Sequence, residues 1–428
     1  MKIAYLCHFS NYSVRNRLLL KTWSTRNHIF RLLKHPKQHH ADYAVWNTDF
    51  IKEFEKKKQH EFHVISPHSG MKKRIQEFAH NGIYYHFFKD DGSLLYDFVF
   101  AKLKLGQRTN YKTNRERISM IIDKINPDIV VLCGAECTPF AIAVLDINKI
   151  PVYTLLQTCA NLKKYIDAGI GTDYDRSIER AIFKKAMYFG TIVKQFYDKY
   201  KEINENAICL PVRFPTHNPS IINVKKEYTF VFFGRVVANK GIEDLLSALA
   251  IVVKKYDNVR LNVIGSCSPE YRTVLDKKIA DLGLQDNVVY SPYYCNMDDM
   301  YMQVQKAQIA VLPGITASMN STVRESMFMK IPTIVYETNA CNLANKERQC
   351  LIIAQMNNIE DLASKMFYCL EHPDKLKVIV NNAYDYANTH FSNEHIGDKL
   401  IKNIIAIVNN NNYHAPIPRS LLYNEEFV

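Results

Sequence analysis

Short apolar runs alternate with amphipathic stretches along almost the whole chain of 428 residues, in two successive series. The runs are typical of strands buried on both faces, and the stretches between them repeat apolar residues at three- and four-residue steps, as helices do. Such alternation predicts parallel sheets covered by helices on both faces. The expected strands are 2–8, 62–66, 83–88, 128–134, 152–156 and 188–193 in the first series, and 228–233, 260–265, 287–291, 308–313 and 333–336 in the second.

The chain is too long for a single core, so each series is expected to form its own doubly wound α/β domain. The join is predicted in the proline-rich segment 211–227, which ends in charged residues. We therefore expect a first domain over 1–215 and a second over 216–393. The remaining residues, 394–428, are expected to form a last helix, which ends near 408, and a tail.

Positive charge is concentrated in the first half of the chain. Residues 1–215 contain 34 Lys and Arg against 21 Asp and Glu, whereas the rest of the chain contains 21 against 22. The basic residues cluster in KKK (56–58), KKR (72–74) and the segment 102–117. A solvated face is one interpretation, and attraction to an anionic membrane surface or an anionic acceptor is the other. No nucleic-acid-binding motif accompanies the charge, so a nucleic-acid partner is not expected.

Targeting and cysteine patterns indicate a reducing compartment. The first apolar run is too short for a signal peptide, and no segment reaches the roughly 18 apolar residues that a membrane span needs. None of the ten cysteines forms a CxxC pair, which argues against a disulfide framework or a zinc site. We expect a cytoplasmic protein, either free or peripheral on the cytoplasmic face of the membrane.

The stretch FFGRVVANKGIEDLL (232–246) places two cations, five residues apart, on a strand-to-helix loop. Arg235 and Lys240 are expected at the carboxyl end of a parallel sheet, where α/β proteins bind ligands. Two cations at a helix start suit a diphosphate, at about 1.5–3 kcal/mol for each charge-assisted hydrogen bond. The other interpretation is a pair of surface charges near a turn. The stretch lacks the GxGxxG spacing, which argues against a nicotinamide enzyme.

A second stretch, VLPGITASMNSTVRESMFMKIPTIVYE (311–337), places a carboxylate near the same sheet edge. Glu325 follows a buried strand and a small polar loop, and it could accept hydrogen bonds from both hydroxyls of a ribose. The alternative is structural, because Thr322 and Glu325 have the spacing of a capping box, in which the glutamate satisfies a backbone N–H group. The spacing leaves the two interpretations equally open.

The patterns GR-x4-KG (234–241), a strand–glycine loop (264–271) and P-x11-E-x6-P (313–332) together resemble the donor domain of family-4 glycosyltransferases of the GT-B fold. The resemblance covers 228–390 and extends to 1–215 through topology alone. It implies two facing Rossmann-like domains with a cleft between them. The second would bind a nucleotide-diphosphate sugar, the first would bind the acceptor, and transfer would retain the anomeric configuration. The last helix would cross back to the first domain.

The resemblance assigns roles to residues of the second domain. It implies that Arg235 and Lys240, beside Gly234, hold the diphosphate. As fixed cations they would stabilise the charge on the departing group, in place of a metal ion. Glu325 would bind the ribose hydroxyls, and Tyr293 belongs to the segment that would hold the base. No metal and no cofactor beyond the donor substrate is expected.

The donor domain departs from the family's pattern at one position. The first glutamate of the family's E-x7-E motif falls on Ala317, and that glutamate normally contacts the transferred sugar. The identity of the sugar, and activity itself, therefore stay open. Ser318, Asn320 and Ser321 are small polar residues that could partly replace it.

Acceptor-side candidates lie in the first domain. A histidine that the family often carries after its fifth strand is replaced by Gln157, which can hydrogen-bond a sugar hydroxyl but cannot relay a proton. Glu136 follows a buried strand at the same predicted edge, and Tyr12 and Trp46 could flank an acceptor groove. The DYD sequence (173–175) matches a metal-binding DxD, but it precedes a helix, so a helix cap is the favoured interpretation.

These observations together predict a metal-independent glycosyltransferase of the hexosyl type. Its acceptor would be a saccharide or a lipid-linked saccharide, in bacterial surface polysaccharide or glycolipid assembly, as the resemblance and the charge suggest. Two alternatives stay open: a catalytically silent nucleotide-sugar binder, suggested by Ala317 and Gln157, and a nucleotide-sugar epimerase of the same architecture.

Overall fold

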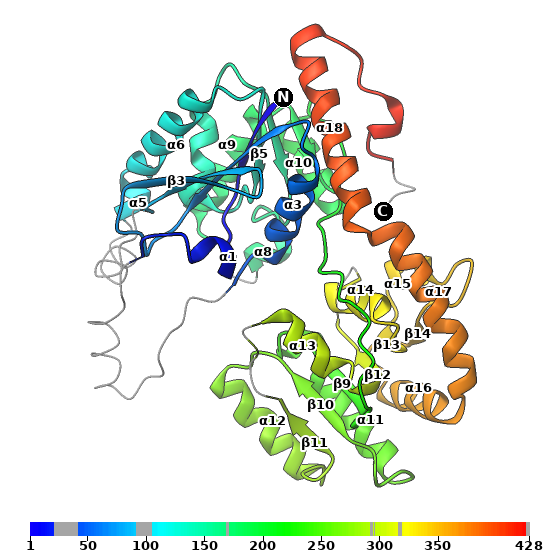
Figure 1. Ribbon diagram of the computed structural model, residues 1–428. Coiled ribbons are helices and arrows are strands. Elements are labelled where there is room, and N and C mark those ends of the chain that lie inside the picture. Colours follow the sequence, from blue (N-terminus) through cyan, green and yellow to red (C-terminus); the bar gives the residue numbers. More distant parts are fainter. Residues whose placement is uncertain are drawn as a thin grey trace, which may run out of the picture. The chain divides into compact units, whose positions relative to one another are not determined.

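The computed structural model describes residues 1–20, 42–90, 105–167, 171–291, 294, 296–315 and 319–424. The chain divides into two compact units (Figure 1). Unit 1 consists of Met1–Pro215 with Asn393–Val428, and unit 2 consists of Thr216–Ser392. The break after Pro215 lies inside the proline-rich segment 211–227.

Unit 1 contains an eight-stranded sheet in the order β3-β4-β2-β1-β5-β6-β7-β8. All neighbouring strands are parallel except β3 and β4, which form an antiparallel hairpin. The expectation of a purely parallel sheet is therefore wrong at this edge. The strands are β1 (Lys2–Leu6), β2 (Glu61–Pro67), β3 (Ile75–His80), β4 (Ile83–Phe88), β5 (Ile129–Cys133), β6 (Val152–Leu155), β7 (Tyr188–Gly190) and β8 (Ile208–Cys209).

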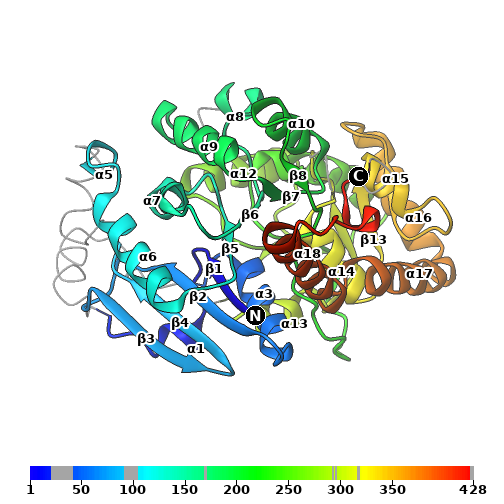
Figure 2. The same cartoon turned by 90° about the horizontal axis from the view of Figure 1, so that it is seen from above.

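Helices cover both faces of this sheet, because successive residues of each strand point to opposite sides. In β1, Ile3 and Tyr5 belong to the apolar cluster under α3 and α18, whereas Ala4 and Leu6 belong to the cluster under α6, α9 and α10 (Figure 2). The helices of unit 1 are α1 (Tyr12–Arg15), α3 (Val45–Lys56), α5 (Leu105–Arg108), α6 (Lys112–Ile125), α7 (Thr138–Ala141), η1 (Ile142–Asp146), α8 (Lys163–Asp167), α9 (Asp173–Lys185), α10 (Lys194–Ile203), α18 (Asn393–Tyr413) and η3 (Arg419–Leu421).

Helix α18 is part of the core of unit 1. Its buried face includes Leu400 and Ile404, and the Asn403 amide donates to Tyr153 Oη at 3.1 Å. A Cβ atom on Gly397 would lie 2.9 Å from Glu53 Cβ, so the glycine lets α18 approach α3 closely. The helix extends through the polar tract 409–412, beyond the end predicted near 408. One reason is that Asn410 in this tract accepts a hydrogen bond from Tyr188 Oη at 2.7 Å.

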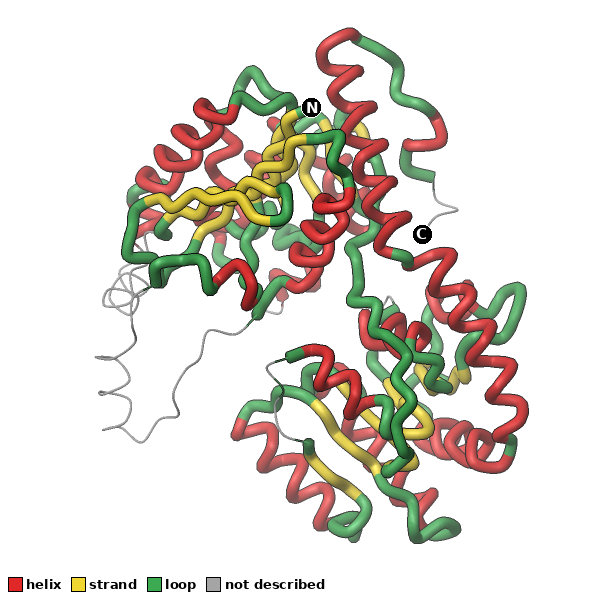
Figure 3. Tube along the Cα trace, viewed as in Figure 1, coloured by secondary structure: helices red, strands yellow, loops and turns green. Residues whose placement is uncertain are grey.

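Unit 2 contains a six-stranded parallel sheet in the order β11-β10-β9-β12-β13-β14, with helices on both sides (Figure 3). No helix in the described residues of either unit is long and apolar enough to cross a membrane. The strands are β9 (Tyr228–Phe233), β10 (Leu261–Ile264), β11 (Val288–Tyr290), β12 (Ala307–Leu312), β13 (Thr333–Tyr336) and β14 (Ile352–Ala354). The helices are η2 (Ala238–Lys240), α11 (Ile242–Val253), α12 (Pro269–Asp281), α13 (Met297–Val304), α14 (Ser321–Phe328), α15 (Asn339–Ala344), α16 (Ile359–Glu371) and α17 (Pro373–Phe391).

The strand order of unit 2 reverses beside β9. From β9 the chain continues outward to β10 and β11, and it then returns to the other side of β9 to form β12. The carboxyl ends of β9 and β12 therefore lie next to each other at the switch point of the sheet. Ligands of open parallel sheets bind at this position, because the loops that follow the two strands turn in opposite directions.

Candidate functional site

Two loops meet at the switch point of unit 2. Strands β9 and β12 pair directly, with Val231 opposite Ala310, so the loops that follow them start side by side. The backbone N–H of Ile315, in the loop after β12, donates to the carbonyl of Asn239, in the loop after β9, at 3.0 Å. The two loops are thus held together by their own backbones.

Glycines permit the close approach of these loops. Gly241 has φ of +73°, and a Cβ atom there would lie 2.0 Å from the carbonyl oxygen of Pro313. Gly265, after β10, has φ of +146°, and its Cβ would lie 1.7 Å from the carbonyl oxygen of Gly234. Both distances are shorter than any real contact, and the left-handed φ values also favour glycine. The loops after β9, β10 and β12 therefore form one packed cradle.

The two predicted cations lie in this cradle. Lys240 is half-buried, and its Nζ donates to Asn320 Oδ1 at 2.8 Å. Burial lowers the pKa of Lys240, and the positive charge of Arg235 lowers it further, so the two cations are close enough to repel each other. Arg235 itself is exposed. Within the described part of the chain neither side chain forms an ion pair, which makes the cradle a site of uncompensated positive charge.

Glu325 lies on α14, next to the cradle, and is only 7% exposed. The capping-box alternative is wrong. Helix α14 begins at Ser321 with Asn320 as its N-cap, so Thr322 is already inside the first turn and cannot be the cap. Glu325 is the fifth helical residue, whereas a capping box needs the third. The capping box predicted between Thr322 and Glu325 therefore does not form.

The structure thus brings together most of the predicted donor-site residues. Gly234, Arg235 and Lys240 come from the loop after β9, and Asn320, Ser321 and Glu325 come from the N-terminus of α14 and the residue before it. The methyl group of Thr322 would lie 3.1 Å from a Cβ on Gly234, so this helix start packs directly against the GR motif. Tyr293, Ala317 and Ser318 lie outside the described residues.

The acceptor-side candidates lie at the corresponding edge of the sheet of unit 1. Glu136 follows β5 and Gln157 follows β6, and these strands are parallel neighbours. Glu136 Oε2 is buried and has no hydrogen-bond partner among the described residues. Burial, and then the nearby carboxylate of Glu179, raise the pKa of Glu136 to about 8. Its raised pKa favours the protonated carboxylic acid, which can donate a hydrogen bond as well as accept one.

Two residues near Glu136 were missed by the sequence analysis. Glu179, on α9, is fully buried and accepts from the backbone N–H groups of Ala160 and Asn161, both at 3.0 Å. It thus fixes the loop that follows Gln157. His8, at the end of β1, has its Nδ1 3.9 Å from the sulfur of Cys137, and burial lowers the pKa of its ring. The sequence signal that could have identified Glu179 is its position as an acidic residue on the apolar face of a predicted helix. His8 lies within a predicted strand, and no sequence signal set it apart from the other residues of that strand.

Glu136 gives a pH-dependent prediction. Its folded-state pKa, about 8, lies above that of an unfolded glutamate, so the folded protein holds a proton that the unfolded chain releases. Its contribution to stability therefore falls as pH rises from about 4.5 to about 8. In Glu136→Gln this dependence is removed, and we expect the melting temperature of the variant, relative to the unmodified protein, to rise between these limits.

Thermal unfolding in a series of buffers measures this difference. The exposed Glu205 provides the control, because Glu205→Gln should leave the curve of melting temperature against pH unchanged. Parallel curves for Glu136→Gln and the unmodified protein would show that Glu136 is ionised in the fold.

The DYD sequence begins helix α9 rather than following a strand, but the N-cap is Thr172, and Asp175 contributes as the third residue of a capping box. Thr172 is the N-cap of α9: its Oγ1 accepts from the backbone N–H of Asp175, and the Asp175 carboxylate accepts from the backbone N–H of Thr172 at 3.0 Å. Asp173 pairs with Arg176 at 2.7 Å. Among the described residues no three metal-ligating side chains converge. Of the two groove candidates, Tyr12 is 68% exposed, and Trp46 Nε1 is buried without a partner in the described residues.

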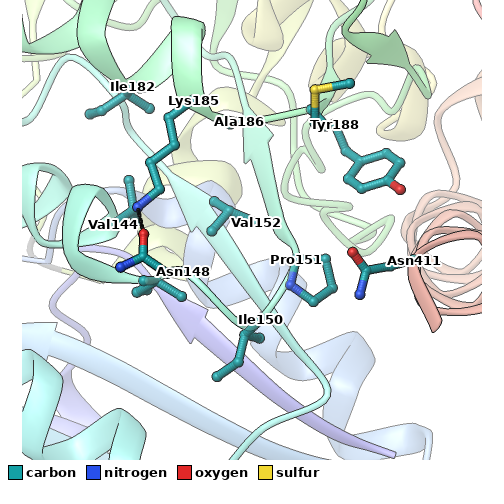
Figure 4. A pocket seen from close by; sticks show the side chains of 12 residues that line it. Val144, Asn148, Ile150, Pro151, Val152, Ile182, Lys185, Ala186, Tyr188 and Asn411 are labelled. Atoms are coloured by element: carbon teal, nitrogen blue, oxygen red, sulfur yellow. Dashed lines mark hydrogen bonds between the residues drawn. The ribbon is translucent and has the colours of Figure 1, made fainter.

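A cavity of about 150 Å³ lies elsewhere in unit 1. Figure 4 shows Pro151, Val152 and Tyr188 around it, together with Asn411 of α18. The lysine in its wall, Lys185, donates to Asn148 Oδ1 at 2.9 Å, as the dashed line in Figure 4 marks. The cavity lies at the amino ends of β6 and β7, the edge opposite to Glu136 and Gln157. None of the predicted site residues lines it.

Part of the sequence is similar to a known family and to known proteins. Residues 214–386 match the family described as glycosyl transferases group 1. The chain is 20% identical over 291 residues to an uncharacterized glycosyltransferase of Haemophilus influenzae, covering 65% of this chain and 76% of the relative. It is 24% identical over 176 residues to the poly(glycerol-phosphate) alpha-glucosyltransferase of Bacillus subtilis, covering 40% of this chain and 25% of the relative.

Solved structures resemble almost the whole chain. Sucrose-phosphate synthase from Thermosynechococcus elongatus has a TM-score of 0.67 at 11% identity and covers 95% of this chain and 99% of its own. Anabaena HepE in complex with UDP and glucose has a TM-score of 0.61 at 13% identity, with coverage of 95% and 99%. These likenesses confirm the predicted α/β fold with two parallel-sheet domains, the GT-B fold.

Proposed function

We propose that this chain transfers a hexose-type sugar from a nucleotide-diphosphate sugar to a saccharide or lipid-linked saccharide. The family match and the names of the relatives support a group 1 glycosyltransferase. The observation that carries the proposal is the pair Arg235 and Lys240, which lack anionic partners among the described residues and lie at the switch point of unit 2. A diphosphate is the ligand that two adjacent cations in such a cradle neutralise best.

The same pair supplies the proposed chemistry. As the bond between sugar and diphosphate breaks, negative charge develops on the departing phosphate oxygens. Arg235 and Lys240 stabilise this charge, and because the backbone of the cradle fixes their loop, they need little reorganisation at that moment. This is the work that a bound metal ion does in DxD enzymes, so the proposed reaction needs no metal. Retention of configuration and membership of family 4 are part of the proposal.

Glu325 is proposed to accept hydrogen bonds from the ribose hydroxyls. Two observations support this role: the predicted capping box with Thr322 does not form, and α14 begins beside Gly234. Asn320 is proposed to orient Lys240 through their 2.8 Å hydrogen bond and to contribute to the subsite that Ala317 leaves without its glutamate. The solved HepE complex contains UDP and glucose, which makes uridine-diphosphate sugars the first donors to test.

The acceptor is proposed to bind unit 1 at the edge that carries Glu136 and Gln157. Both side chains can hydrogen-bond hydroxyl groups, as a saccharide acceptor requires, and the raised pKa of Glu136 favours its neutral form. One relative of this chain is named as a poly(glycerol-phosphate) alpha-glucosyltransferase. Bacterial surface polysaccharide or glycolipid assembly is therefore the proposed setting.

A panel of nucleotide sugars tests the proposal by thermal stabilisation. A ligand that binds only the native state at a hundred times its Kd adds about 2.7 kcal/mol to stability, so the cognate donor should raise the melting temperature by several degrees. Absence of stabilisation by any nucleoside diphosphate or its sugars would contradict the site.

Product analysis with the stabilising donor then separates the alternatives. Transfer to an added acceptor, or slow hydrolysis of the donor, indicates a transferase. An altered sugar on an intact nucleotide, formed without acceptor, indicates an epimerase. Binding without any product indicates the silent binder that Ala317 and Gln157 suggest.

A further inference from the structure

Two segments of unit 1 that are distant in the sequence form one exposed surface. The backbone N–H of Lys72 donates to the carbonyl of Leu19 at 2.8 Å, and the N–H of Leu19 donates to Gln76 Oε1 at 2.9 Å. Gln76 in turn donates to the carbonyl of Arg17 at 2.7 Å. The turn after α1 is thereby fixed to the connection between β2 and β3. The exposed residues of this surface, here called the β2–β3 patch, are Arg17, Leu19, Lys72, Lys73 and Arg74.

The charge of the β2–β3 patch is not compensated. Its four cations form no ion pair with the residues that the structure describes. By contrast, the nearby Arg15 forms an ion pair with Asp42, with a distance of 2.8 Å between Nη1 and Oδ1. Leu19 is 49% exposed, and its carbonyl accepts the hydrogen bond from the backbone N–H of Lys72. Cations beside an exposed apolar side chain are the arrangement that anionic lipid headgroups and the adjoining acyl chains accommodate.

The position of the patch relates it to the acceptor edge. Helix α1 follows the carboxyl end of β1, and residues 72–74 follow the carboxyl end of β2. Glu136 and Gln157 follow the carboxyl ends of β5 and β6 in the same parallel sheet. The patch and the proposed acceptor residues therefore lie along the same edge of unit 1.

We propose that the β2–β3 patch docks unit 1 on an anionic lipid surface, with the edge that carries Glu136 and Gln157 turned toward the headgroups. The orientation would present a lipid-linked acceptor directly to that edge, and in this respect the proposal rests on the proposed function. The docking itself depends on the patch alone. A soluble polyanionic saccharide is the competing partner for the four cations, but it gives no role to the exposed Leu19.

The chain offers a control of equal charge at the opposite edge. Lys58, Lys149 and Lys184 are exposed and unpaired within the described residues, and they precede β2, β6 and β7, at the amino ends of the strands. Reversing these three charges changes the net charge of the protein by the same amount as reversing Lys72, Lys73 and Arg74. Any difference between the two triple variants therefore reports where the charges lie.

Co-sedimentation of the full chain with vesicles is the test. We use phosphatidylcholine vesicles that contain about one third phosphatidylglycerol, and vesicles of pure phosphatidylcholine. The protein should bind the anionic vesicles alone, with an affinity that falls as salt is raised. Each basic residue near such a surface contributes about fivefold, so Lys72→Glu, Lys73→Glu and Arg74→Glu together should weaken binding by 100-fold or more. The control triple should bind within about tenfold of the unmodified chain, through loss of long-range attraction.

Leu19→Asp should also weaken vesicle binding without a change in the basic residues. Binding of uridine diphosphate should be unchanged in all these variants, which shows that they fold and keeps this test separate from that of the donor site. Equal losses in the two triple variants would overturn the proposal, and so would absence of binding to anionic vesicles. Binding of heparin but not of vesicles, with the loss confined to the patch triple, would assign the patch to a soluble polyanion instead.

Discussion

Arg235→Ala and Lys240→Ala should each weaken binding of a nucleoside diphosphate by about 10- to 150-fold. This range corresponds to the loss of a charge-assisted hydrogen bond of about 1.5–3 kcal/mol. Isothermal titration calorimetry with uridine diphosphate and guanosine diphosphate measures the change. Arg348→Ala and Lys277→Ala remove exposed cations of unit 2 away from the cradle and should leave the affinity unchanged.

The double variant and the kinetics sharpen this prediction. Because Arg235 and Lys240 repel each other in the free protein, each single substitution also removes this repulsion, so the double variant should lose more binding free energy than the sum of the two single losses. In transfer assays kcat should fall as well as donor affinity, since the charge on the diphosphate grows as the bond to the sugar breaks. Unchanged affinity in both single variants would remove the basis of the proposed function.

Gly241→Ala should destabilise unit 2 by roughly 3–5 kcal/mol, a loss of about 10 °C in melting temperature. The methyl group would lie 2.0 Å from the carbonyl oxygen of Pro313, in a backbone conformation that L side chains seldom adopt. The loops after β9 and β12 would have to separate, so donor binding should fail with stability. Differential scanning calorimetry measures the first effect and titration with the donor measures the second.

Gly283 provides a matched control for the backbone conformation. Its φ is +68°, close to that of Gly241, but nothing lies within 4 Å of a Cβ atom placed on it. Gly283→Ala should therefore cost only the conformational strain, about 1–2 kcal/mol, and should leave donor binding intact. Similar losses in both variants would mean that the cradle can open to admit a side chain at Gly241.

The central strands could be predicted from the sequence, whereas the edge strands β3, β8 and β14 could not. Strands such as β5 and β9 are continuous apolar runs, because both of their faces are covered by helices. Strand β8 has two residues and β14 has three, too few for a pattern. Strand β3 was not predicted, although the sequence Asn81-Gly82 is typical of a two-residue hairpin turn. In the structure both residues have positive φ, as such a turn between antiparallel strands requires.

The site could be predicted where its chemistry is local in sequence. Arg235 and Lys240 share one strand-to-helix loop, so their spacing alone placed them together. The capping alternative for Glu325 could not be decided from spacing, because it depends on whether α14 begins at Ser321 or after Thr322. The raised pKa of Glu136 depends on its burial and then on Glu179, and the β2–β3 patch depends on contacts between Leu19 and Lys72. Both features depend on residues that are far apart in the sequence and close in the fold, and the periodicity of apolar residues does not indicate such contacts.

The route of the backbone dictates an order of assembly on the ribosome. Residues 216–392 form an uninterrupted segment that can fold as soon as it emerges, whereas the sheet made by the first half lacks Leu400 and Ile404 until much later. At a synthesis rate of about 5–20 residues per second, the delay is on the order of 10–40 s. During that interval the nascent protein displays the apolar side that α18 will cover, so the part translated first is the part most exposed to aggregation and most dependent on chaperones.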